Sequence, residues 1–128
     1  MKEIKRKTVD LGIEKSVYFL GSRGDVNQLY SAFDALVFPS HYEGLPVTLV
    51  KTHAAALPCL ISNTITTETD INPSLRRLSL DKSAYEWAEV LYSLISTSNR
   101  ENSKKRIVDA GYDIETTTKR LTSIYSES

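Results

Sequence analysis

The sequence predicts a single α/β domain in which helices flank a parallel sheet. Three short apolar runs are nearly continuous, as in strands buried on both faces of a parallel sheet; they span residues 17–20, 35–38 and 59–61. Segments with helical apolar spacing separate these runs, and a weaker fourth run follows at residues 75–80. Strands that alternate with helices are typical of a layered fold with right-handed crossovers.

The composition agrees with a globular domain. The 128 residues are 41% hydrophobic and 25% charged, and sixteen basic residues balance sixteen acidic ones. This balance gives no global electrostatic reason to expect a nucleic-acid partner. No apolar run follows the basic opening residues, so we expect no signal peptide and a cytoplasmic location. The single cysteine, Cys59, lies in an apolar run and is predicted to be a small buried hydrophobe.

The predicted helices have recognisable starts. Asp25 can cap a helix over residues 26–33, and Pro46 suits the first turn of the next helix, where its missing N–H costs nothing. Ser83 and Glu86 have the spacing of a capping box ahead of a long apolar stripe. Helices are expected to fill most of residues 83–127.

Candidate chemistry lies in the loops after the strands, because ligands of an open parallel sheet bind beyond the carboxyl ends of its strands. The loop at residues 40–46 leads into a helix whose first N–H groups form a natural anion site. Glu43 in this loop accepts hydrogen bonds, and sugar hydroxyls are matching donors. Phosphate beside a sugar describes a nucleotide sugar. The alternative is that Glu43 only compensates the helix dipole.

Other polar residues carry less information. His41 and His53 are too few for a metal site, so we expect neither a metal nor a cofactor. His41 is interpreted as a surface residue, with proton transfer as the alternative. Glu68, Asp70 and Asp81 lie near the ends of later elements, where contact with a ligand is an open alternative, but nothing in the sequence selects them.

The segment at residues 17–62, VYFLGSRGDVNQLYSAFDALVFPSHYEGLPVTLVKTHAAALPCLIS, resembles the donor-binding part of the family 4 (group 1) glycosyltransferases, retaining enzymes of the GT-B architecture. The FLG strand, the PS strand end, EGLP and the A-A-x-x-P step occur in the family's order. The resemblance implies that residues 1–128 form a single partial domain: a Rossmann-like C-terminal GT-B domain that lacks its first two strands.

The resemblance also implies roles for individual residues. Glu43 would contact hydroxyls of the donor sugar, the backbone N–H groups of Gly44, Leu45 and Val47 would approach sugar and phosphate, and residues 21–23 would lie near the base. The family's second glutamate, eight residues after the first, falls at Lys51, which has three donors and no acceptor. Ala56 stands where the family often has glycine. The implied binding residues are Glu43, Gly44, Leu45, Pro46, Val47, Lys51, Gly21, Ser22 and Arg23; no catalytic residue is assigned.

The resemblance implies a hexosyltransferase that moves a sugar from a UDP- or GDP-sugar to a glycan or lipid-linked acceptor held by a domain outside this sequence. We expect the chain alone to be inactive, because the groups that stabilise the leaving diphosphate are not in it. The alternative is a non-catalytic nucleotide-binding or interaction module derived from a degenerate transferase, which Lys51 favours. A flavodoxin-like receiver would need an acidic cluster at the first strand end, which the sequence lacks.

An incomplete sheet has a further implication for how the strands pair. Residues 17–20 are expected either to pair directly with residues 35–38 or to leave an edge that another chain fills, so self-association through the sheet is a prediction.

For the full-length enzyme, a peripheral position at the inner membrane face is the alternative to a purely cytoplasmic one.

Overall fold

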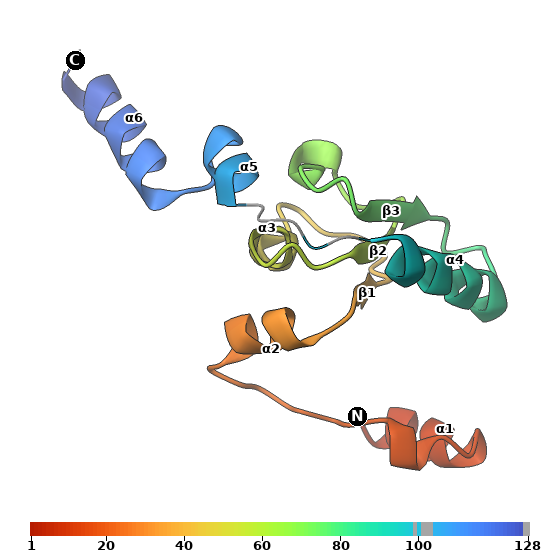
Figure 1. Ribbon diagram of the computed structural model, residues 1–128. Coiled ribbons are helices and arrows are strands. Elements are labelled where there is room, and N and C mark those ends of the chain that lie inside the picture. Colours follow the sequence, from red (N-terminus) through yellow and green to blue (C-terminus); the bar gives the residue numbers. More distant parts are fainter. Residues whose placement is uncertain (99, 101–103, 127–128) are drawn as a thin grey trace.

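The protein, seen here in a computed structural model that describes residues 1–98, 100 and 104–126, is built on a three-stranded parallel sheet. Its strands are β1 (Leu36–Phe38), β2 (Cys59–Ser62) and β3 (Leu75–Leu78), in the order β1-β2-β3 (Figure 1). All four residues of β2 are buried, as expected of a central strand with a neighbour on each side. The α/β prediction is confirmed.

Helices surround and extend beyond this sheet. They are α1 (Lys2–Asp10), α2 (Val26–Ala32), α3 (Val47–Ala54), α4 (Ala84–Thr97), α5 (Lys104–Asp109) and α6 (Ile114–Ser126), with short 3-10 turns η1 (Glu14–Ser16) and η2 (Thr67–Thr69). Helix α3 lies against α2 and α5, while α4 lies against β2. Figure 1 shows α1 and α6 projecting away from the sheet at opposite ends of the molecule.

The core forms where α3 meets the sheet. Leu49 of α3 is fully buried against Cys59 and Ile61, which point to the same face of β2 because side chains alternate along a strand. Ile65, just after β2, completes this cluster. Cys59 is fully buried, which confirms its predicted place in the core.

Residues 17–20 form no strand, and the prediction that they pair with residues 35–38 is wrong. Val17 is only half-buried, and Tyr18 is 80% exposed. Within the described residues, β1 pairs with β2 on one side, and no strand pairs with its other side. Residues 17–20 therefore lack the neighbouring strand that a strand needs for its backbone hydrogen bonds. Lys5 of α1 instead lies 5.4 Å above the ring of Phe19. That another chain fills this edge stays a prediction.

Three helices end in the same hydrogen-bonded turn, a Schellman motif. The residues in the left-handed position are Gly12 after α1, Ala56 after α3 and Gly111 after α5, with φ of 67°, 51° and 78°. After α3, the N–H of Ala56 donates to the carbonyl of His53 (3.0 Å) and the N–H of Leu57 donates to that of Thr52 (2.9 Å). Ala56 therefore holds a conformation that favours glycine, at the position where the resemblance often places one.

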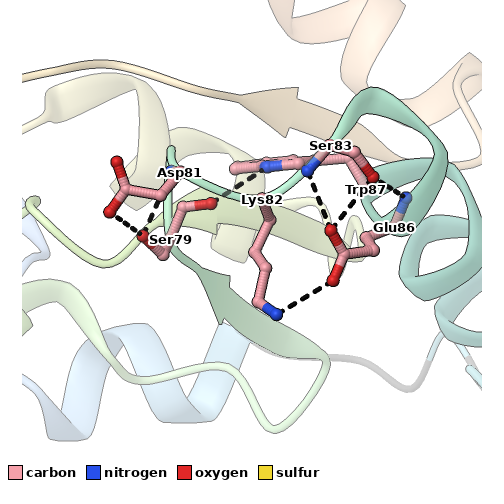
Figure 2. Close-up of polar contacts among 6 residues, drawn as sticks. All are labelled: Ser79, Asp81, Lys82, Ser83, Glu86 and Trp87. Atoms are coloured by element: carbon pink, nitrogen blue, oxygen red, sulfur yellow. Dashed lines mark hydrogen bonds and ion pairs between the residues drawn. The ribbon is translucent and has the colours of Figure 1, made fainter.

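The start of α4 confirms the predicted capping box. The Ser83 hydroxyl accepts from the N–H of Glu86 (3.2 Å), and the Glu86 carboxylate accepts from the N–H of Ser83 (2.9 Å). Lys82 adds an ion pair to Glu86 at 2.9 Å (Figure 2). The indole N–H of Trp87 donates to the carbonyl of Ser79 (3.2 Å), which fixes α4 to the end of β3.

Two other helix starts differ from their predictions in detail. Asp25 occupies the N-cap position of α2, but its carboxylate pairs with the Arg23 guanidinium at 2.6 Å and makes no cap hydrogen bond. Helix α3 begins at Val47, and Pro46 is its N-cap residue. The loop that carries Glu43 thus leads directly into α3.

Candidate functional site

Glu43 lies in a cavity at the carboxyl ends of β1 and β2. The cavity has a volume of about 460 Å³. It is lined by Tyr42, Glu43, Gly44, Leu45, Thr64, Thr66 and Glu68. The first four residues follow β1 and the other three follow β2, so two adjacent strand-end loops form the two walls, in the place where sheets of this kind bind ligands.

Hydrogen bonds orient Glu43 and join the two loops. The Ser40 hydroxyl donates to Oε1 of Glu43 at 2.9 Å. The carbonyl of the same Ser40 accepts from the hydroxyl of Ser62 and, at 2.9 Å, from that of Thr64. One residue at the end of β1 therefore positions the carboxylate and also anchors the wall that follows β2.

The approach to α3 is open. A Cβ added to Gly44 would meet no atom within 4 Å, so a ligand has room to reach this part of the backbone. Pro46 is buried at the N-cap, and α3 continues from Val47 over eight residues. The first N–H groups of such a helix lie outside its own hydrogen-bond ladder and carry partial positive charge, which suits phosphate.

The second wall is held by an arginine from β3. Arg77 donates to the carbonyls of Ile65 (2.6 Å) and Thr66 (2.7 Å), and its guanidinium forms a two-pronged ion pair with Asp70. The Tyr112 hydroxyl, between α5 and α6, donates to the carbonyl of Glu68 at 3.1 Å. These contacts fix the loop from both ends.

Thr64, Thr66 and Glu68 were not among the residues that the sequence predicted for the site. The sequence feature that could have identified them is the one that identified Glu43: they follow a strand of a parallel sheet, within the polar stretch SNTITTET. No helix with a recognisable glycine or proline start marks this stretch, and only the folded chain brings it opposite Glu43.

Several predicted site residues lie elsewhere. Lys51 is exposed and lines a separate cavity of about 350 Å³ between α2 and α3, together with Asn27 and Tyr30. Residues 21–23 do not line the cavity beside Glu43, and Arg23 is engaged with Asp25. The structure thus brings Glu43, Gly44 and Leu45 together with the start of α3, and Lys51 faces a different opening.

Two further features bear on the chemistry that this part of the chain can support. Over residues 1–98, 100 and 104–126, no three His, Cys, Asp or Glu side chains come together as a metal-binding group. In the same residues, no helix has the length and apolar character needed to cross a membrane.

Comparison with known proteins defines the class of protein. The family described as "Glycosyl transferases group 1" matches residues 1–97, and this chain belongs to that family. A protein of Bacillus subtilis (strain 168) that carries the name glycosyltransferase EpsF is 36% identical over 129 aligned residues, which cover 98% of this chain and 34% of EpsF. The chain thus spans about a third of the length of that relative.

A shorter match and a solved structure agree with this assignment. A protein of Escherichia coli named UDP-Gal:alpha-D-GlcNAc-diphosphoundecaprenol alpha-1,3-galactosyltransferase is 35% identical over 54 residues, which cover 42% of this chain and 14% of that protein. The crystal structure of WaaG, a glycosyltransferase involved in lipopolysaccharide biosynthesis, superposes with a TM-score of 0.64 at 20% identity, covering 85% of this chain and 30% of WaaG. The sheet and helices therefore form part of the GT-B fold.

Proposed function

We propose that this chain is the donor-binding portion of a retaining glycosyltransferase that moves a hexose from a nucleoside diphosphate sugar to a glycan or lipid-linked acceptor. The observation that carries the proposal is the position of Glu43: an oriented carboxylate in a cavity at the strand ends, directly before the N-terminus of α3. The carboxylate suits sugar hydroxyls and the helix terminus suits phosphate.

The names of the relatives support the substrate classes. One relative is named for a UDP-galactose donor and a diphosphoundecaprenol-linked acceptor. Another, WaaG of Escherichia coli (strain K12), is named a lipopolysaccharide glucosyltransferase and is 36% identical over 50 residues, which cover 39% of this chain and 13% of WaaG. We extend to this chain only the common chemistry, a nucleotide-activated hexose and a glycan or lipid-linked acceptor. The 128 residues alone are expected to bind donor without transferring it, because transfer needs acceptor-side groups and stabilisation of the leaving diphosphate.

Calorimetry with the 128-residue chain tests this proposal. UDP, UDP-glucose, UDP-galactose, GDP and GDP-mannose are titrated separately, and we expect one base series to bind, with the sugar nucleotide bound more tightly than the nucleotide alone. Glu43→Gln should remove the advantage of the sugar, about tenfold, because a neutral amide accepts weaker hydrogen bonds. Glu14→Gln, on the distant η1 turn, is the matched control. Failure of all five compounds to bind would refute the proposal.

The second candidate, a non-catalytic nucleotide-binding or interaction module, is favoured by one observation. Lys51 has the place of the family's second glutamate, and it lines the cavity between α2 and α3 without a carboxylate that could accept ribose hydroxyls. Lys51→Glu distinguishes the candidates. If the site is a weakened donor site, this variant should bind the nucleotide more tightly; unchanged or absent binding would favour the non-catalytic module.

A further inference from the structure

We propose that Thr64, Thr66 and Glu68 form a second sugar-binding wall opposite Glu43, and that the two walls together select an uncharged sugar over a uronic acid. This inference rests on the proposed function and deepens it, since it assigns the class of sugar. Glu68 becomes a specificity-determining residue that contacts the sugar, in a loop that no sequence motif marks as part of the site.

The chemistry of the cavity supports this choice. Two glutamates, Glu43 and Glu68, and the hydroxyl-bearing residues Thr64, Thr66 and Tyr42 line it. No Lys or Arg is found among its lining residues, all of which the structure describes. Carboxylates and hydroxyls satisfy the many donors of a neutral hexose. A diphosphate has no cationic partner here, which places the phosphates outside this cavity, toward the start of α3.

The charge of a uronic acid would be unfavourable in this cavity. Its carboxylate would enter a cavity lined by two glutamates and by no Lys or Arg, so the repulsion between like charges would not be compensated there by a cation. Glu43 lies on one wall only, so by itself it would repel a charged sugar from one side of the cavity. Glu68 on the opposite loop gives repulsion from both sides, so it adds specificity as well as hydrogen bonding.

Several contacts hold the backbone of the second wall in place. Arg77 holds the carbonyls of Ile65 and Thr66, and its ion pair with Asp70 closes the loop beyond Glu68. Ile65 is buried in the core, which anchors the loop beneath the cavity. A wall whose backbone is fixed in this way cannot move aside to admit an extra charge without losing these contacts.

Both walls also share one anchor. Thr64 donates to the carbonyl of Ser40 at 2.9 Å, and the hydroxyl of Ser40 donates to Glu43 at 2.9 Å. The spacing between the walls is therefore set by the end of β1, and the cavity is preorganised for one class of sugar.

Calorimetry with matched donor pairs tests the inference. The 128-residue chain is titrated with UDP-glucose and UDP-glucuronate, and with GDP-mannose and GDP-mannuronate, so that base preference and rejection of the acid are measured separately. We expect the neutral member of the accepted pair to bind at least about tenfold more tightly than the acidic member. Glu68→Gln should reduce this ratio severalfold, while Glu14→Gln should leave it unchanged.

The outcomes separate this inference from the proposed function. If the accepted nucleotide sugar binds but Glu68→Gln leaves both affinities and their ratio unchanged, the second wall is refuted and the donor site stands. Equal affinity of the parent chain for the two members of a pair also refutes the selectivity. If no nucleotide and no nucleotide sugar binds, both proposals are wrong. Because Glu68 is exposed, thermal unfolding of Glu68→Gln should match that of the parent chain.

Discussion

Ser40 holds the carboxylate of Glu43 through a hydrogen bond of 2.9 Å between its hydroxyl oxygen and Oε1. Only two residues lie between them, so the loop after β1 orients its own carboxylate before any ligand arrives. The Ser40 carbonyl accepts from Ser62 and Thr64 in the neighbouring loop, so this one residue serves both sides of the cavity.

Ser40→Ala should weaken binding of the accepted nucleotide sugar by about tenfold, because the carboxylate loses a charge-assisted hydrogen bond that orients it. Binding of the nucleotide without sugar should change little. Calorimetry measures both. Ser40→Thr keeps the hydroxyl and is the matched control; equal losses in the two variants would show that the hydroxyl has no such role.

Ala56→Gly should raise the free energy of unfolding by about 1 kcal/mol, because Ala56 holds φ at 51° in the turn after α3, where a Cβ is strained. Urea denaturation measures the change. Ala88→Gly, at an exposed site inside α4, should lower the free energy of unfolding by about 1 kcal/mol. Destabilisation by both substitutions would contradict the assignment of strain to Ala56.

Stability should fall in acid partly through the cap of α4. Hydrogen bonds from Lys82 and from Ser83 lower the pKa of Glu86 to about 2, from an ordinary value of 4.5. The folded state therefore prefers the ionised carboxylate, so its contribution is complete above about pH 4.5 and is lost as the pH falls toward 2. Urea denaturation across this range should show a smaller loss for Glu86→Gln. A loss as steep as in the parent chain would argue against this linkage.

Cys59 should resist modification in the folded chain. Burial raises the pKa of its thiol to about 11, so very little thiolate exists near neutral pH. Iodoacetamide at about pH 8 should label the protein only after denaturation, as mass spectrometry would report. Rapid labelling of the native chain would mean that the β2 core opens readily.

The sequence predicted the sheet correctly where a strand has neighbours and failed where it has none. The apolar runs at residues 35–38 and 59–61 become β1 and β2, while the equally apolar run at residues 17–20 does not form a strand. An apolar pattern shows that a segment can be buried. It does not show whether another strand lies beside it, and a strand requires that partner for its backbone hydrogen bonds.

The residues of the candidate site also fall into those that local sequence predicts and those that it does not. Glu43 could be predicted because a strand, a glycine and a helix start surround it in the sequence. Glu68 could not, since its place in the cavity depends on Arg77 and Asp70 closing the loop, contacts that no local pattern encodes. Lys51 was placed by its spacing from Glu43, and the short α3 helix instead turns it toward α2.

The hydrogen bond from Tyr112 to the carbonyl of Glu68 has a consequence for where this domain ends in practice. The match to the family covers residues 1–97, yet a support of the cavity beside Glu43 comes from beyond them. A shortened chain cut after α4 would keep the residues that match the family and still lose this support. The stretch that joins α5 to α6 is therefore tied to the loop at Glu68, and a truncation before it would release one of the contacts that hold this loop.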